Sequence, residues 1–210
     1  MDGTAAPTGR KSRIGALCDV HHIKTDGVHI DNYLLLFVHR HAPLALEGFF
    51  EAVTITGASV FVLPLAASVA LGLLWRGFRS EALLIALSSG LAAIVVYVVK
   101  ASVGRARPSL WTTDWYWGSS FPSGHTLVVA AFATATALCI GRRWPGQRRL
   151  AMMLAFVWIF LVGLSRLVLG VHWPTDVLAA ACIGAFLPLA IDLALAAQRK
   201  KRRRPVVRTP

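Results

Sequence analysis

The sequence predicts an all-α protein, a polytopic transmembrane helical bundle of five or six spans with an N-terminal interfacial amphipathic helix. Hydrophobic residues make up 56% of the 210 residues. Charged residues make up 15%, whereas soluble domains carry about 25%. The mean hydropathy is +0.60, and apolar stretches of bilayer-spanning length recur along the chain. Together these observations exclude an ordinary soluble domain.

The N-terminal part is less apolar than the rest. Residues 1–27 are polar and predict an arm without a packed core. Residues 28–50 contain one short apolar run, Tyr33–Val38, which is flanked by charged residues, histidines and Pro43. A spanning helix needs about 20 mostly apolar residues, so we expect this segment to form an interfacial helix on the membrane surface. If it crossed the membrane instead, the chain would have six spans.

The transmembrane domain is predicted over residues 51–198. Two of its apolar stretches are short for a span, which is tolerable when polar ends reach the interface. In the third apolar stretch, Ser119–Gly141, we expect the helix to begin near His125. The five predicted spans are Val53–Leu74, Ala82–Val99, Ser119–Gly141, Leu150–Ser165 and Val177–Ile191.

A basic tail is predicted over residues 199–210, and the net charge of the whole chain is +12. The unbroken run of cations Arg199–Arg204 follows an apolar helix directly. This position is typical of an anchor to anionic lipid, with a solvated tail as the alternative. No base-reading motif accompanies the run, so we expect no nucleic-acid partner.

The loop charges predict the orientation of the chain in the membrane. With five spans, the 17 Lys and Arg residues that follow the first span divide into 13 on one side and 4 on the other. The positive-inside rule makes the richer side cytoplasmic. The N-terminal arm opposes this assignment, because five spans place its four basic residues outside.

Three polar stretches lie on the side that is poorer in cations. Lys100–Pro108 follows the second span, Pro122–His125 begins the third, and Ser165–Asp176 joins the last two. They supply cations, small residues with accessible backbone N–H groups, two histidines and a carboxylate. This combination suits covalent phosphoryl transfer, in which cations hold the phosphate while one imidazole attacks and another donates a proton.

Each of these residues also has a plainer interpretation. His172 and Asp176 are four residues apart and would share a helix face, so the carboxylate could hold the imidazole in one tautomer. Asp176 could equally be a helix cap. Ser123 at a helix start could expose N–H groups to an anion or simply cap the helix. Arg166 could extend to the lipid headgroups.

The order of the three stretches is more specific than any one of them. Lys-x6-Arg-Pro, Pro-Ser-Gly-His and Ser-Arg-x3-Gly-x-His-x3-Asp follow one another, with every position filled. This pattern resembles the signature of the phosphatidic acid phosphatase type 2 family, which is itself similar to the vanadium haloperoxidases. The resemblance covers about residues 50–195. Family members commonly have six spans, and this chain lacks a clear first one.

The resemblance implies a role for each matching residue. His172 would be the nucleophile, Asp176 would orient it, and His125 would protonate the leaving group. The phosphate oxygens would be held by Lys100, Arg107, Ser123, Gly124 and Arg166. Arg105 falls outside the signature and is predicted to be a surface charge. Neither a cofactor nor a metal is expected, because the cations would supply the electrostatic stabilisation.

The sequence therefore predicts an integral membrane lipid phosphatase of a bacterial cytoplasmic membrane, with its active site at the extracytoplasmic face. The implied substrates are phosphatidic acid, phosphatidylglycerophosphate or undecaprenyl pyrophosphate. One alternative is a lipid phosphotransferase that uses the same phosphohistidine. Another is a lipid-binding or transport protein without turnover. Transporter sites usually lie near the bilayer midplane, whereas the polar groups here lie at span ends.

Overall fold

The computed structural model describes residues 28–111 and 118–203, so the predicted arm at 1–27 and the last residues of the tail lie outside it. Every regular element among the described residues is a helix. Two short 3₁₀ turns, η2 (Leu44–Leu46) and η3 (Pro145–Gln147), join longer helices. The α-helices are α1 (Val28–His41), α2 (Glu47–Thr56), α3 (Ser59–Trp75), α4 (Arg79–Val103), α5 (Gly124–Arg143), α6 (Arg148–Val168) and α7 (Pro174–Arg203).

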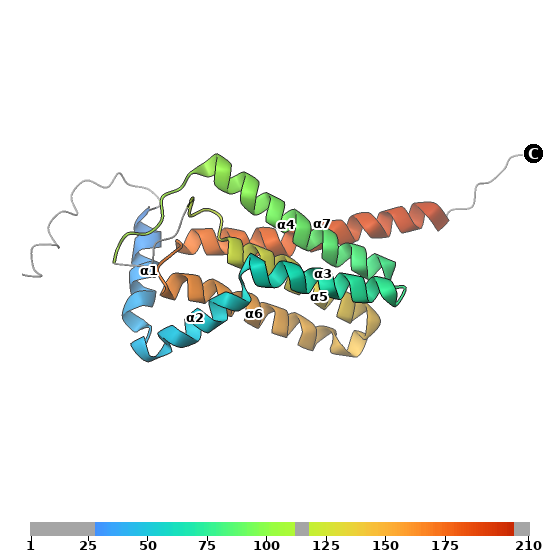
Figure 1. The fold of residues 1–210 in the computed structure, drawn as a ribbon, viewed down its shortest axis with the longest axis horizontal. Helices are drawn as coiled ribbons and strands as arrows, with labels where there is room; N and C mark the ends of the chain where they lie inside the picture. The colour runs from blue at the N-terminus through green and yellow to red at the C-terminus, as the bar shows by residue number, and fades with distance from the viewer. Residues whose placement is uncertain (1–27, 112–117, 204–210) are drawn as a thin grey trace, which may run out of the picture.

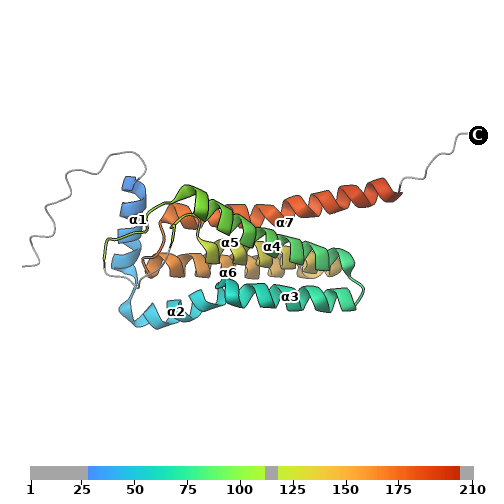
Figure 2. The same cartoon turned by 45° about the horizontal axis from the view of Figure 1, so that its top comes forward.

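The bundle is built around α5. Helices α3 to α7 run along one long axis, and α1 lies across one end of the bundle (Figures 1 and 2). Most side chains of α5 are buried, and α4, α6 and α7 all pack against it. A Cβ atom added at Gly184 of α7 would lie 2.4 Å from the Leu127 carbonyl oxygen of α5. Glycine thus lets α7 approach the α5 backbone directly.

The helices have the lengths and surfaces of membrane spans. Within residues 28–111 and 118–203, four helical segments are long and apolar enough to cross a bilayer, namely α4, α5, α6 with η3, and α7. The bent pair of α2 and α3 would make a fifth. Large apolar side chains such as Leu83, Phe156 and Leu178 are exposed on the outside of the bundle, as lipid contact requires. The predicted polytopic helical bundle is confirmed.

The first predicted span, Val53–Leu74, is not one straight helix in the structure. It is divided between α2 and α3, whose axes differ by 43°. A Cβ atom at Gly57, in the break, would lie 2.5 Å from Val162 on α6. The chain therefore bends where its backbone touches α6. An apolar run indicates a nonpolar environment and leaves the direction of the helix open.

The predicted segment boundaries at the two ends also differ from those of the structure. The helix expected over residues 28–50 ends at His41, because Pro43 interrupts it before α2 begins. At the other end, α7 continues past residue 198 to Arg203. On helix α1, Asp31 is buried, whereas large apolar side chains such as Tyr33 and Phe37 are exposed. Its location at the membrane surface stays a prediction.

Candidate active site

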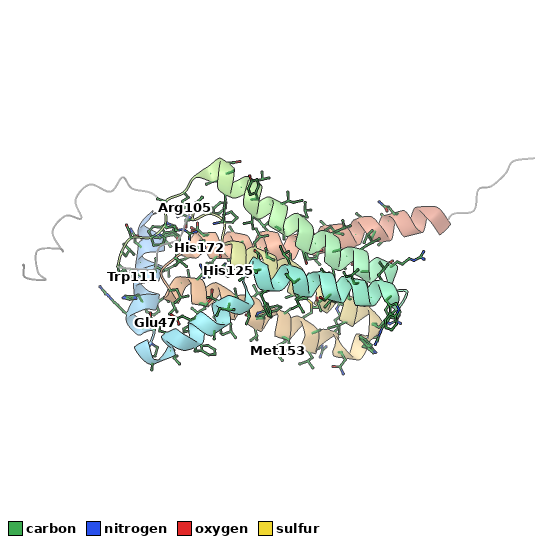
Figure 3. All side chains as sticks on the ribbon, in the orientation of Figure 1. Glu47, Arg105, Trp111, His125, Met153 and His172 are labelled. Carbon is green, nitrogen blue, oxygen red and sulfur yellow. The ribbon has the colours of Figure 1, made fainter. Side chains whose placement is uncertain are left out.

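The three polar stretches meet at the end of the bundle that α1 crosses. The last turn of α4, the start of α5 and the loop from α6 to α7 all reach this end, where Figure 3 labels Arg105, His125 and His172. The histidine His172 lies within electrostatic range of Lys100, Arg107 and Arg166. The same three cations and His172 act on His125. The residues of the predicted site are therefore brought together, although they are spread over 77 positions from Lys100 to Asp176.

The loop that carries His172 has a defined backbone geometry. Helix α6 ends in a Schellman motif, in which the Val171 N–H bonds the Arg166 carbonyl at 3.2 Å and the Gly170 N–H bonds the Leu167 carbonyl at 3.0 Å. The φ angle of Gly170 is +67°. A Cβ atom at Gly170 would also lie 2.6 Å from the indole ring of Trp111. A glycine is therefore needed at position 170 both for the positive φ angle and for the close contact with Trp111. The loop thereby fixes the position of His172 after the end of α6.

His172 and Asp176 lie side by side and are both buried. Asp176 is in the first turn of α7, where it accepts the Trp173 N–H at 3.0 Å, as the acidic partner of a capping box does. Its Oδ2 atom also accepts the hydroxyl of Ser120. His172 Nδ1 lies 3.7 Å from the same oxygen. This separation exceeds a hydrogen bond, and such contacts commonly tighten when substrate binds.

The surroundings of His172 favour its neutral form. Burial is the main cause that lowers the pKa of His172 from 6.5 to about 4. The neighbouring cations, Arg166 foremost, lower it further, and the Asp176 carboxylate opposes them. At neutral pH the imidazole therefore carries a free electron pair, which nucleophilic attack needs.

We expect the imidazole of His172 to remain neutral throughout the range from pH 6.5 to pH 5. Its lowered pKa means that protonation begins only as the pH approaches 4. In Asp176→Asn the pKa should fall still further, because the opposing carboxylate is lost. The measurement is an NMR titration of protein labelled with ¹³C at histidine Cε1, with the resonance assigned from its absence in His172→Ala. A midpoint at or above 6.5 would contradict the expectation.

Two of the predicted phosphate ligands are held by loop carbonyl groups. The Lys100 ammonium group, near the end of α4, donates to the Ser119 carbonyl at 2.6 Å. Arg107 donates from Nη1 to the Val171 carbonyl at 2.8 Å and from Nε to the Gly118 carbonyl at 3.2 Å. Arg107 thus links the segment that follows α4 to the loop that carries His172. These bonds place both cations around the same end of α5.

Arg166 is buried inside the bundle, with only 2% of its surface exposed. The alternative that it extends to the lipid headgroups is therefore wrong. Its Nη1 atom donates to the hydroxyl of Thr54 on α2 at 2.6 Å. Burying a guanidinium group is costly without anionic or polar partners. The arrangement of Arg166 beside two further cations favours an anionic ligand.

The start of α5 offers backbone donors to such a ligand. Ser123 precedes the helix, but its side chain does not cap it. Its hydroxyl lies 3.0 Å from the Thr126 hydroxyl instead. A Cβ atom at Gly124 would lie 3.2 Å from Val96 and 4.0 Å from Lys100 Cε. The first turn of α5, whose N–H groups have no partner within the helix, therefore lies beside the Lys100 side chain.

The prediction that Arg105 is a surface charge is wrong. Its guanidinium group donates to Asp176 Oδ1 at 2.5 Å and to Asp31 on α1 at 2.6 Å. Its place two residues before Arg107 was a signal for a role at the site, whereas nothing in the sequence showed that α1 contacts it. The residues that sequence reasoning missed at this end of the bundle are Asp31, Thr54, Arg105, Ser120 and Thr175.

Comparison with known proteins supports this assignment. The family model described as PAP2 superfamily matches residues 81–200, which is more than half of the chain. The chain belongs to the PAP2 superfamily. The predicted family is thereby confirmed. The match contains all three polar stretches in full.

Individual PAP2 relatives agree with the family match. Phosphatidylglycerophosphatase B of Bacillus subtilis is 32% identical over 145 residues, which are 68% of this chain and 71% of the relative. Undecaprenyl-diphosphatase of Sulfolobus acidocaldarius is 29% identical over 124 residues, which are 56% of this chain and 57% of the relative. A crystal structure of a transmembrane PAP2 type phosphatidylglycerolphosphate phosphatase from B. subtilis has a TM-score of 0.73 and 26% identity, over 87% of this chain and 90% of that one. The prediction of an integral membrane phosphatase is confirmed.

Proposed function

We propose that this PAP2 protein removes phosphate from a membrane lipid through a phosphohistidine at His172. The supporting observation is the burial of His172 beside Asp176 and among Lys100, Arg107 and Arg166. A neutral imidazole next to a carboxylate is a nucleophile, and the cations attract the anion that it attacks. Few other reactions need these groups together.

In the first step, His172 Nδ1 faces Asp176 and keeps its proton, so Nε2 carries the electron pair. This pair attacks phosphorus and forms the N–P bond while the bond from phosphorus to the lipid oxygen breaks. His125, which must carry a proton in the substrate complex, donates it to that oxygen, which leaves as an alcohol. Asp176 stabilises the positive charge that develops on the imidazole. The cations and the α5 N–H groups stabilise the charge on the phosphoryl oxygens.

In the second step, water replaces the lipid. His125, now unprotonated, accepts a proton from the water as its oxygen attacks phosphorus. The N–P bond breaks, its electron pair returns to Nε2, and inorganic phosphate leaves. His125 and His172 thereby recover their starting states. Every group in this cycle belongs to a residue of the signature, and the cycle is balanced without an additional acid or base.

Among the three expected substrates, phosphatidylglycerophosphate is the first choice. The B. subtilis relative and the B. subtilis phosphatase of known crystal structure are both named for this lipid. Undecaprenyl pyrophosphate is the second choice, by the name of the S. acidocaldarius relative. Phosphatidic acid, the third, carries the same terminal phosphomonoester as phosphatidylglycerophosphate.

The proposed function is tested by measuring phosphate release with purified protein in detergent, in the presence of EDTA. The panel consists of the three lipids and a soluble alkyl phosphate. We expect release from at least one lipid, with no requirement for a divalent ion and with inhibition by vanadate, which mimics the transition state. Activity that EDTA abolishes and one divalent ion restores would overturn the proposed cation-based mechanism.

The same assay separates hydrolysis from transfer. Glycerol or another alcohol is added as an acceptor, and free phosphate and phosphorylated alcohol are measured together. We expect free phosphate to be the main product, since the B. subtilis and S. acidocaldarius relatives are both named as phosphatases. A product that is mainly phosphorylated alcohol would make the chain a phosphotransferase.

We also propose that the active site faces the extracytoplasmic side of a bacterial cytoplasmic membrane. Helix α5 leads from the site to the basic turn around η3, and α6 leads back. The site and this turn must therefore lie on opposite sides, whatever the N-terminus does. The four arginines that flank η3 favour the cytoplasm for the turn.

Cysteine labelling tests this orientation. The background lacks the native cysteines Cys18, Cys139 and Cys182, and carries either Leu110→Cys beside the site or Gly146→Cys in η3. A membrane-impermeant maleimide added to intact cells should label the first variant and not the second. Permeabilised cells, in which both should react, are the control. The reverse pattern would invert the topology, and labelling of both in sealed cells would contradict the span assignment.

A further inference from the structure

Helix α1 is attached to the active-site end of α7 through one buried carboxylate. Asp31 is 1% exposed, although it lies in a helix with large apolar groups on its outer face. Its Oδ1 atom accepts the Thr175 backbone N–H at 3.0 Å, and its Oδ2 atom accepts the Thr175 hydroxyl at 2.6 Å. Asp31 therefore satisfies one of the open N–H groups in the first turn of α7 from another helix.

Arg105 links this carboxylate to that of Asp176. Its Nη2 atom bonds Asp31 at 2.6 Å, and its Nη1 atom bonds Asp176 Oδ1 at 2.5 Å and the Thr175 hydroxyl at 2.8 Å. Its guanidinium carbon also lies 5.7 Å from the centre of the Trp173 ring. Neither carboxylate is exposed to solvent. We name the chain of contacts Asp31–Arg105–Asp176 the carboxylate bridge.

The carboxylate bridge contacts Oδ1 of Asp176, the carboxylate oxygen that does not face His172. Arg105 holds Oδ1, while Ser120 and the Trp173 N–H hold Oδ2, the oxygen nearest to His172 Nδ1. Rotation of the carboxylate about its Cβ–Cγ bond would exchange the two oxygens and is opposed by these bonds. Arg105 can fix Asp176 only if it is itself fixed, and Asp31 holds its other nitrogen.

We propose that Asp31 and Arg105 are positioning residues for the reaction, which act on His172 through Asp176. The proposal rests on the function proposed above. In this proposal α1 helps to position the active-site carboxylate, in addition to any role at the membrane surface. Arg105 contacts Asp176 at Oδ1, whereas His172 lies nearest to Oδ2, and neither Asp31 nor Arg105 is one of the proposed phosphate ligands. Their loss should therefore slow the chemical step and leave phosphate binding largely unchanged.

The test uses three substitutions and a matched control. Asp31→Asn keeps an oxygen for the Thr175 N–H but removes the charge that holds Arg105. Asp31→Glu restores the charge, and Arg105→Lys keeps a cation that cannot bridge two carboxylates in the same way. The control is Asp192→Asn, which breaks the ion pair of Asp192 with Arg142 at the opposite end of α5. Each variant is assayed for kcat, KM and inhibition by vanadate.

We expect Asp31→Asn and Arg105→Lys each to lower kcat about ten- to a hundredfold, the usual loss when a partner that orients a reacting group is removed. KM and the inhibition constant of vanadate should change less than about threefold. Asp31→Glu should recover part of kcat. Asp31→Asn with Arg105→Lys should be no worse than the poorer single variant, because both break one chain of contacts. Asp192→Asn should behave as wild type.

Several outcomes would overturn the inference. Normal kcat in Asp31→Asn, with a wild type that is active, would show that the bridge does not position Asp176. Equal losses in kcat and in vanadate binding, or additive losses in the double variant, would assign Asp31 a general structural role. Near-UV circular dichroism and gel filtration identify a variant that fails to fold, in which case Arg105→Lys alone decides. An inactive wild type that releases no phosphate would instead contradict the proposed function.

Discussion

Replacing His172 by alanine should abolish phosphate release while leaving the protein folded. In the proposed mechanism His172 is the nucleophile, and water alone cannot form the phosphoenzyme. By comparison with other enzymes that lose a nucleophile or its base, we expect kcat to fall roughly 10⁴-fold or more. The imidazole is buried, but it lies in a loop whose path is fixed by the Schellman motif and by Gly170. Alanine should therefore be tolerated structurally.

The matched control for this variant is His41→Ala. His41 is an exposed histidine at the end of α1, and its ring hydrogen-bonds the Phe37 carbonyl and packs against the Phe37 ring of the same helix. This variant should retain wild-type kcat. Wild-type protein quenched in alkali during turnover should carry phosphate on a histidine, and His172→Ala should carry none. Near-normal turnover in folded His172→Ala would refute the assignment of the nucleophile.

The fold could be predicted from the sequence because a segment that crosses a bilayer must satisfy its backbone hydrogen bonds internally. Long stretches without charge have few alternatives to spanning helices, and the positions of α4 to α7 follow the predicted stretches closely. The bend between α2 and α3 could not be predicted in this way. It depends on the contact of Gly57 with Val162, two residues more than 100 positions apart.

The predicted site residues lie together because span parity forces them to one side of the bundle. The signature stretches are separated by an even number of crossings, so they return to the same end. Periodicity within one helix cannot show which residues of another helix lie opposite. For this reason Asp31 and Thr54, on α1 and α2, were missed, although each bonds an arginine near the site. Arg105 was missed because its neighbours in sequence do not reveal the two carboxylates around it.

His125→Gln should separate the two proton transfers of the reaction. Glutamine has about the size of histidine and can donate a hydrogen bond, but it cannot give up or accept a proton. The natural lipid leaves as an alkoxide unless it is protonated, so the first step should slow by about 10² to 10⁴. With p-nitrophenyl phosphate the leaving group is stable without a proton. In that case kcat/KM, which reports the steps up to phosphoenzyme formation, should change little.

The second step still needs a base when p-nitrophenyl phosphate is the substrate. Without His125 the water is not activated, and phosphoenzyme should accumulate on His172. The expected time course is a rapid burst of nitrophenolate, about one per active site, followed by slow turnover, while the protein becomes labelled with phosphate. The double variant His125→Gln with His172→Ala should show no burst. Equal slowing of the lipid and the nitrophenyl substrate, without a burst, would mean that His125 only shapes the site. A burst with retained phosphoenzyme needs both a histidine nucleophile and a separate acid–base group, and so it would identify both residues at once.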